Sequence, residues 1–370
     1  MLNLFGRQGV ACLLCALGLA GGLCGVALAA EEAALPRLHE VFAGKFQIGV
    51  SLDATELPGA AGDAVHAPLL GHFNAVTPED DMKWEKLQPL EGAFDFSATD
   101  ALVEYARAHN MRVTGHALVW HRQTPAWVFA AADGGPAPRE LVVERLRAHI
   151  HAVMTRYRGK VDGWDVVNEA LSDVPGVYLR ESPWLQALGE EYVPMAFRFA
   201  READPEARLY YNDYGIELPH KRAMLLRLME SLKVAGVVPD AINIQGHFSL
   251  GFPPVAEIER TLDAIAGLGL RANISELDVS VFSFGQHDDP YREGLPAEIL
   301  EQQAQRYGEL FALFLRHASG IDRVTFWNLH DGLSWLNREP VPGRTDYPLL
   351  FDRAGHPKPA YFRVVQTAKG

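Results

Sequence analysis

The feature of this 370-residue chain that most constrains its fold is an eightfold alternation of short β-rich apolar segments with longer segments of helical periodicity. Strands that alternate with helices in this way form parallel sheets, and eight such units are enough to close one. The sequence therefore predicts an α/β protein, a single (β/α)8 TIM barrel. The expected strands are 47–53, 72–77, 112–120, 161–168, 208–214, 241–247, 271–279 and 322–329, and helical segments between them include 99–110, 139–157, 220–235, 255–268 and 297–317.

The first thirty residues differ from the rest of the chain. A single charged residue, Arg7, precedes an uncharged apolar run from Val10 to Ala30 that ends in the letters ALAA. This is the pattern of an export signal with a small-residue cleavage site. We therefore expect residues 1–30 to be a signal peptide, residues 31–370 to be one barrel domain, and the mature protein to be periplasmic or extracellular. Because about 20 apolar residues suffice to span a bilayer, an uncleaved membrane anchor is the alternative.

Charge and cysteine content exclude several classes of function. The formal net charge is −13 at pH 7, and an acidic surface repels nucleic acid and anionic lipid, whereas a neutral polysaccharide carries no such penalty. Cys12, Cys15 and Cys24 all lie within the expected signal peptide, so the mature chain would contain no disulfide, zinc-thiolate site or thiol nucleophile. We expect a monomer without a cofactor, with no nucleic-acid partner and no membrane partner unless the anchor remains.

Polar side chains gather at the C-terminal ends of the predicted strands, where the active sites of parallel barrels lie. Hydrolysis of an acetal needs one carboxyl group to protonate the leaving oxygen and a second to stabilise the oxocarbenium-like centre. Indoles suit the apolar faces of sugar rings, and amides and imidazoles bind hydroxyl groups. Each residue alone has a structural explanation, but together they predict a glycoside hydrolase. They are Glu79, His116, Trp120, Asn168, Glu169, Asn212, Asp213, Gln245, His247, Glu276, Asp278 and Trp327.

These residues lie in eight strings that closely resemble glycoside hydrolase family ten, whose members are chiefly endo-β-1,4-xylanases. The strings follow the family order from about Phe46 to the C-terminus. The resemblance implies hydrolysis of internal β-1,4-xylosidic bonds of xylan or xylo-oligosaccharides. The strings are FNAVTPEDDMKW (73–84), GHALVWHRQTPAW (115–127), GWDVVNEAL (163–171), YYNDYGIE (210–217), IQGH (244–247), ISELD (274–278), TFWNLHDGLSW (325–335) and PLLFDRAGHPKPAY (348–361).

The resemblance also implies the catalytic roles. Glu169 would be the acid/base and Glu276 the nucleophile of a retaining double displacement, with their carboxyl groups ~5–5.5 Å apart. Asn168 would hold the 2-hydroxyl group of the sugar at the cleavage point. Gln245 would lie beside Glu169, and His247 would be hydrogen-bonded to Glu276.

Further residues are expected by resemblance to bind sugars on the non-reducing side of the cleavage point. Asp278 would not touch the sugar itself but would orient the His247 ring. Trp327 and Trp335 would close over these subsites. The residues expected to line them are Glu79, Asp80, Lys83, His116 and Trp120.

The chain departs from the family pattern at a few positions. Asp80 stands where Asn is usual, and a carboxylate can accept but not donate a hydrogen bond, so one sugar contact differs; Lys83 would partly offset its charge. Asn328, followed by His330, stands where a small residue is usual and would narrow the cleft or add a polar contact. Ser275 replaces the commoner Thr.

Three alternatives remain open. One is a related specificity at the same site, as a retaining β-1,4-glucanase or cellobiosidase. Another is a non-catalytic carbohydrate-binding barrel, which both glutamates argue against. The third is a metal-dependent barrel hydrolase, suggested by four histidines near strand ends, although the first predicted strand lacks the paired histidines that usually open such sites. The four are His116, His121, His247 and His330.

Overall fold

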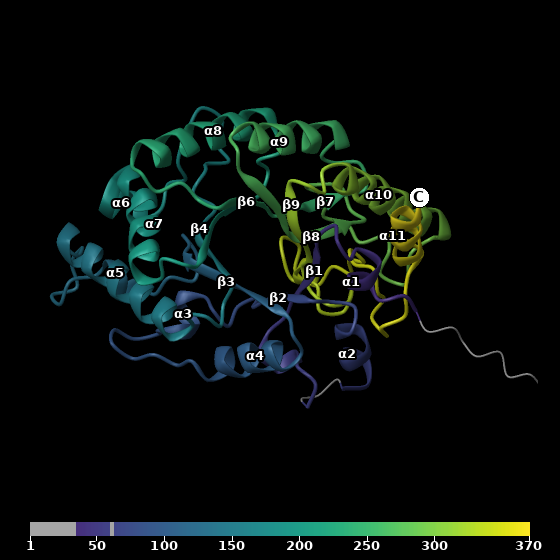
Figure 1. Cartoon of the computed structure of the whole chain (residues 1–370), viewed down its shortest axis with the longest axis horizontal. Helices are drawn as coiled ribbons and strands as arrows, with labels where there is room; N and C mark the ends of the chain where they lie inside the picture. The colour runs from purple at the N-terminus through teal and green to yellow at the C-terminus, as the bar shows by residue number, and fades with distance from the viewer. Residues whose placement is uncertain (1–34, 60–62) are drawn as a thin grey trace, which may run out of the picture. The chain divides into compact units, whose positions relative to one another are not determined.

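Eight parallel strands close into a barrel within the described part of the chain, which confirms the predicted fold class (Figure 1). Strand β9 pairs with β1, and this pairing closes the sheet. A computed structural model describes residues 35–59 and 63–370, and the barrel belongs to the compact unit that begins at Pro36. The strands are β1 Gln47–Ser51, β2 Ala75–Thr77, β3 Arg112–Val119, β4 Gly163–Asn168, β5 Arg208–Asp213, β6 Ala241–Ile244, β8 Arg271–Ser280 and β9 Ile321–Phe326.

The predicted export signal, residues 1–30, lies outside the described residues. Over the part that is described, no helix combines the length and apolar character needed to cross a membrane.

Helices surround the strands as an outer ring (Figure 1). Their limits follow from local sequence: α8 begins at Pro219, where a residue without an N–H suits the first turn, and a left-handed Gly236 (φ +72°) follows its end. Helix α4 buries Leu102, Val103 and Ala106, which share one face at helical spacing. The longer helices are α2 Asp63–Leu70, α4 Ser97–Ala108, α5 Arg139–Arg156, α7 Tyr192–Ala203, α8 Pro219–Val234, α9 Val255–Gly267, α10 Ala297–Arg316 and α11 Pro359–Lys369, and shorter ones are α1 Leu38–Val41, α3 Trp84–Leu87 and α6 Pro183–Leu188.

Buried polar side chains from β3, β4, β6 and β8 form a hydrogen-bonded ladder inside the barrel. Asn273 donates to Asn243 at 2.8 Å, and Asn243 donates to Asp165 at 2.6 Å. The other Asp165 oxygen lies 2.8 Å from Nδ1 of His116, and all four side chains are buried. Because buried polar groups are costly unless they are paired, this ladder fixes the orientation of the His116 ring.

The second strand is shorter than the predicted 72–77. Strand β2 begins only at Ala75, because His72 and Phe73 are held in the turn that follows α2. Their N–H groups donate to the carbonyl oxygens of Leu69 and Leu70 at 3.0 and 3.1 Å.

The sixth strand, predicted as 241–247, is interrupted after Ile244. A second short strand, β7 His247–Ser249, pairs with β8 so that His247 lies opposite Asp278. The break falls at Gly246, whose φ of +86° favours glycine and where an added Cβ would lie 2.9 Å from the Ile274 side chain. Because the strand is interrupted between them, Gln245 lies beside the carboxyl group of Glu169 and His247 beside that of Glu276.

Candidate active site

Glu169 lies one residue beyond β4 at the C-terminal end of the barrel. Its N–H donates to the Asn212 carbonyl oxygen at 2.9 Å, which extends the pairing of β4 with β5 by one residue. Its carboxylate accepts from Trp120 Nε1 at 2.9 Å and from Gln245 Nε2 at 3.1 Å. The carboxyl group of the predicted acid/base is therefore held between the ends of β3 and β6.

Glu276 lies near the end of β8 and is 4% exposed. One oxygen accepts from Asn212 Nδ2 at 2.7 Å and the other lies 3.1 Å from His247 Nε2. Burial alone would raise the pKa of Glu276, but the hydrogen bond and charge of His247 and the hydrogen bond from Asn212 lower it below its usual value. Glu276 is thus ionised at neutral pH, as a carboxylate nucleophile must be.

His247 joins two carboxylates. Its Nδ1 lies 2.8 Å from Asp278 Oδ2, while Nε2 faces Glu276. Burial would lower the pKa of His247, but Asp278 and Glu276 together raise it to about 10. The imidazolium can therefore donate from both nitrogens. Asp278 Oδ2 also accepts from Trp335 Nε1 at 2.8 Å, so one carboxylate orients both the histidine and a tryptophan of the loop after β9.

Three amide side chains connect the two glutamates. Gln245 Nε2, which donates to Glu169, lies 3.2 Å from Asn168 Oδ1, and that oxygen lies 2.9 Å from Asn212 Nδ2, which donates to Glu276. Asn168, Gln245 and both glutamates were predicted site residues, and the structure brings them into one network.

Asn212 was among the polar strand-end residues, but the sequence predicted no role for it in the site. Its place at the C-terminal end of β5 was the only signal in the sequence. Ser275, the mild departure from the family pattern, donates to Asn212 Oδ1 at 2.6 Å and so turns Nδ2 toward Glu276. Serine and threonine both carry a hydroxyl group, so Ser275 provides the hydrogen-bond donor to Asn212 that this position needs.

Glu79 follows β2 and is 9% exposed. It accepts a short hydrogen bond from Asn328 Nδ2. Burial and the charges of Asp53 and Glu56 raise the pKa of Glu79 to about 8, and Lys83 opposes this only in part. Near neutral pH, Glu79 is therefore largely a neutral acid that can donate as well as accept a hydrogen bond.

Asp80, next to Glu79, behaves differently. It lies 3.2 Å from Lys83 Nζ and accepts from Gln123 Nε2 at 3.1 Å. Burial would raise the pKa of Asp80, but Lys83 and Gln123 lower it below its usual value. The Lys83 ammonium also lies 4.6 Å from the centre of the Trp120 ring. Asp80 is thus an ionised acceptor where the family pattern has an amide.

Asn328, directly after Trp327, has a φ of +79°. Glycine adopts this left-handed region most readily, and Asn tolerates it better than most residues, which accounts for a small residue here in the family pattern. Its N–H donates to Ser51 Oγ at 2.7 Å, and its Oδ1 accepts from the N–H of Trp335 at 3.1 Å. The side chain therefore links Glu79 to the loop after β9.

The two predicted tryptophans differ in exposure. Trp327 is 4% exposed, and its ring meets His116 edge to face at 5.4 Å between centroids, so it is part of the wall of the site. Trp335 is half-buried and its ring lies 4.9 Å from that of His247. Trp335 is thus the more available surface for a sugar ring.

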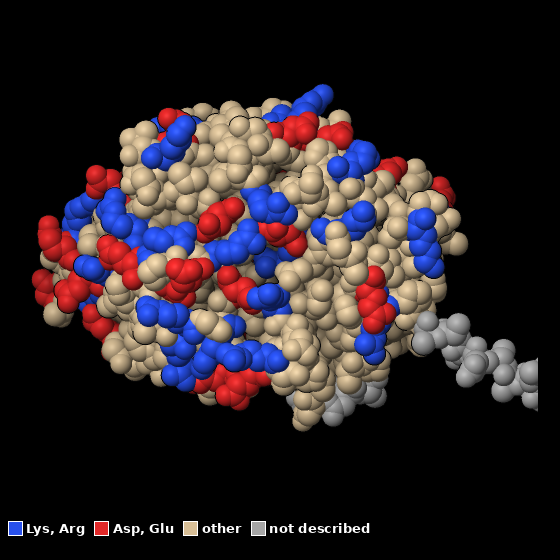
Figure 2. Space-filling view, in the orientation of Figure 1, with Lys and Arg blue, Asp and Glu red and all other residues tan. Residues whose placement is uncertain are grey.

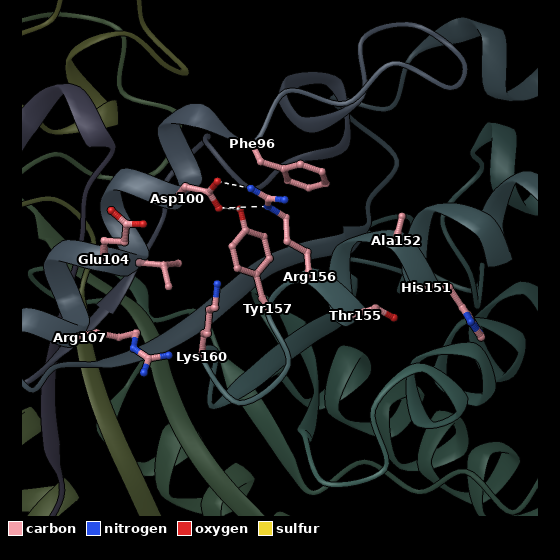
Figure 3. Close-up of a pocket in the computed structure, with 11 residues that line it drawn as sticks. Phe96, Asp100, Glu104, Arg107, His151, Ala152, Thr155, Arg156, Tyr157 and Lys160 are labelled. Carbon is pink, nitrogen blue, oxygen red and sulfur yellow. Dashed lines mark hydrogen bonds and ion pairs between the residues drawn. The ribbon is translucent and has the colours of Figure 1, made fainter.

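A second hollow in the described part of the chain lies away from these residues. This hollow, of about 990 Å³, lies between α4 and α5 on the outside of the barrel, and Figure 3 shows Arg156 and Tyr157 directed at Asp100 within it. No predicted site residue lines this hollow. Figure 2 shows basic and acidic side chains interspersed over the face drawn, not separated into patches. Over residues 35–59 and 63–370, no group of three or more His, Cys, Asp or Glu side chains is arranged to hold a metal ion.

Comparison with known proteins gives a consistent set of relatives. Residues 37–367 match the family model described as glycosyl hydrolase family 10. An endo-1,4-beta-xylanase of Geobacillus stearothermophilus is 42% identical over 335 residues, which cover 90% of this chain and 98% of the relative.

Solved structures agree in fold. A GH10 endoxylanase from a sugarcane soil metagenome has a TM-score of 0.85 and 40% identity, and the match covers 90% of this chain and 99% of that one. A mutant enzyme in complex with xylotriose has a TM-score of 0.86 and 39% identity, with the same coverage. By the family match over most of its length, and by identity with relatives of nearly equal extent, the chain belongs to glycosyl hydrolase family 10.

Proposed function

We propose that this protein is an endo-1,4-β-xylanase that hydrolyses internal β-1,4-xylosidic bonds of xylan or xylo-oligosaccharides by a retaining double displacement. The observation that carries the proposal is the continuous chain of polar contacts from Glu169 through Gln245, Asn168 and Asn212 to Glu276. The relative named as an endo-1,4-beta-xylanase and the solved complex with xylotriose support the choice of substrate.

In the first step Glu276 attacks the anomeric carbon while Glu169 donates a proton to the departing oxygen. The glycosidic C–O bond breaks, the fragment on the reducing side leaves as an alcohol, and the sugar on the non-reducing side is bound to Glu276 through its anomeric carbon as an ester. His247 and Asn212 keep the attacking carboxylate ionised and fixed in direction. Asn168 would hold the 2-hydroxyl group, a contact that strengthens at the transition state.

In the second step Glu169, now a carboxylate, removes a proton from water as the water oxygen attacks the anomeric carbon. The ester bond breaks and Glu276 leaves as a carboxylate beside the His247 imidazolium. Two inversions at one carbon give net retention. The same residue thus acts first as acid and then as base, without a cofactor.

Glu79, Asp80 and Lys83 provide sugar contacts of three kinds. Glu79 offers a neutral carboxyl group, Asp80 an ionised acceptor and Lys83 a charged donor. Hydroxyl groups donate and accept, so this mixture suits a sugar with fixed hydroxyl directions. Trp335 offers an aromatic face nearby.

Export is a further part of the proposal. The apolar run from Val10 to Ala30, with its small-residue end, supports a mature protein that is periplasmic or extracellular. N-terminal sequencing of the protein purified from the host of origin tests this: cleavage near residue 30 is expected, and an intact N-terminus in a membrane fraction would favour the anchor.

Product analysis tests the activity. Wild-type protein should release reducing ends from xylan and defined xylo-oligosaccharides, and much less from cellulose. Glu276→Ala should lose this activity while remaining folded, as checked by circular dichroism. Release from cellulose equal to that from xylan would favour the glucanase alternative, and no release from either would favour a binding barrel.

A further inference from the structure

The backbone of Glu169 adopts an unfavourable conformation. Its φ is +57°, in the left-handed region that side chains other than Gly and Asn rarely occupy. Such a conformation persists only where surrounding contacts fix it. The N–H of Glu169 donates to the Asn212 carbonyl oxygen at 2.9 Å, which fixes the N-terminal side of the residue. Its carbonyl group needs a contact of its own.

Arg180 supplies that contact. Its Nε donates to the carbonyl oxygen of Glu169 at 3.0 Å, and its own N–H donates to the carbonyl oxygen of Ala170 at 2.8 Å. Between these points the chain makes an excursion that is closed by a bridge between Leu171 and Leu179. The loop after β4 therefore returns on itself and brings a guanidinium group onto the main chain of Glu169.

The guanidinium group of Arg180 is itself anchored. Nη2 donates to Tyr214 Oη at 2.8 Å and lies 2.8 Å from Asp173 Oδ2. Lys221, which is 2% exposed, lies 3.0 Å from the other Asp173 oxygen and 2.9 Å from Asp213 at the end of β5. One edge of the planar group thus points at Glu169 while another is tied to β5, a two-sided geometry that a lysine cannot reproduce.

The same segment supports the other side of the acid/base. Trp184, four residues after Arg180, donates from Nε1 to the Trp120 carbonyl oxygen at 2.9 Å, and Trp120 in turn donates to the Glu169 carboxylate. Residues 180–184 therefore act on both the main chain and the carboxyl group of Glu169.

We propose that Arg180 is a positioning residue for the acid/base: it holds the main chain of Glu169 in the left-handed conformation that directs its carboxyl group toward the leaving oxygen. The inference rests on the proposed function and deepens it. Arg180 contacts the carbonyl oxygen of Glu169, and its closest polar partners are Tyr214 and Asp173, not the carboxylate. Without it, Glu169 is free to relax to right-handed φ and to turn its side chain away.

A leaving-group comparison tests the proposal. Cleavage of xylotetraose requires proton donation, whereas 2,4-dinitrophenyl β-xylobioside has a leaving group that departs as a stable anion without it. In Arg180→Lys and Arg180→Gln, kcat/KM on xylotetraose should fall about 100-fold, the usual contribution of a placed acid, while kcat/KM on the dinitrophenyl substrate should stay within about threefold. The ratio of the two values does not depend on the fraction of protein that is folded.

Azide provides a second readout. Azide attacks the glycosyl-enzyme without a general base, so it should raise turnover of the dinitrophenyl substrate by both variants and give β-xylobiosyl azide. Wild-type turnover should not rise.

Arg222→Lys is the matched control. Arg222 is 14% exposed, and it also bridges main-chain carbonyl oxygens, of Glu217 at 2.9 Å and Glu257 at 3.1 Å, to the Glu257 carboxylate. Arg222→Lys should lower the melting temperature about as much as the Arg180 variants do. The ratio of kcat/KM on xylotetraose to kcat/KM on the dinitrophenyl substrate should not change. An equal loss on both substrates in the Arg180 variants, or a ratio restored by Arg180→Lys, would overturn the proposal. Wild-type protein inactive on both substrates would instead overturn the proposed function.

Discussion

His247 stands between Glu276 and Asp278, with Nε2 at 3.1 Å from one carboxylate and Nδ1 at 2.8 Å from the other. The histidine balances two buried negative charges that would otherwise repel each other and would raise the pKa of the nucleophile. The pair of contacts therefore links the ionisation of the site to the stability of the fold.

The first prediction concerns this link. The folded protein keeps a proton on His247 up to about pH 10, whereas an unfolded histidine releases it near 6.5, so the stabilisation is complete below 6.5 and is lost as pH rises to about 10. The free energy of unfolding should fall across this range by up to about 1.4 kcal/mol per pH unit. His247→Asn should remove that slope. Urea unfolding of both proteins at several pH values measures it, and equal slopes would contradict the assignment.

Glu79 gives the second prediction. Its raised pKa, about 8, means that the neutral carboxyl group present at pH 6 becomes a carboxylate by pH 9. Sugar hydroxyl groups that accept from it then lose their donor, so KM for xylo-oligosaccharides should rise through pH 8. In Glu79→Gln, which keeps a donor at all pH values, KM should be flat over this range. The same rise in Glu79→Gln would place the titration elsewhere.

Asp80→Asn supplies a third test. The substitution restores an amide that can donate to sugar while it still accepts from Gln123 and Lys83. A new hydrogen bond is worth about 0.5–1.5 kcal/mol, so KM should fall roughly two- to tenfold with little change in kcat. Steady-state kinetics on xylotetraose measures this. Asp81→Asn, at the neighbouring position, is the control and should leave KM unchanged.

The fourth prediction concerns the backbone at Asn328. Glycine can adopt its φ of +79° without strain, but alanine cannot. Asn328→Ala should therefore lose about 1 kcal/mol more stability than Asn328→Gly, although both lose the same hydrogen bonds to Glu79 and Trp335. Thermal unfolding of the two variants gives the difference. Equal stability would mean that the side-chain contacts, and not the conformation, decide the effect.

The stereochemical outcome is the fifth prediction. Attack by Glu276 followed by attack of water gives two inversions, so proton NMR of fresh digests should show the β-anomer first. The α-anomer appears later, by mutarotation. An α product at the earliest time would require water to attack directly, and would overturn the assignment of Glu276 as nucleophile.

Much of the fold could be predicted because it depends on local patterns. The alternation of apolar strands with helical segments predicted the barrel. The pattern did not predict that the second strand begins only at Ala75 or that the sixth breaks after Ile244. Both depend on how the backbone packs in three dimensions, and an apolar run looks the same in a strand and in the turn before it.

Some residues of the candidate site could be identified from the sequence and others could not. Residues at strand ends, such as Glu169 and Glu276, could be identified from the sequence because parallel strands bring their ends together. Arg180 could not, since it belongs to a loop and reaches Glu169 only because the chain returns on itself between residues 171 and 179. The pattern also could not show that Asn212 touches Glu276, a contact oriented by Ser275 across the barrel.

The interruption at Gly246 has a consequence for how the protein can change over evolution. Gln245 serves the acid/base and His247 serves the nucleophile, although they are only two positions apart. The single residue between them sets a spacing: a deletion or insertion there would deliver each side chain to the wrong carboxylate or to neither. We therefore expect length variation among homologues to be absent from this short stretch, while the exposed loops around it vary freely.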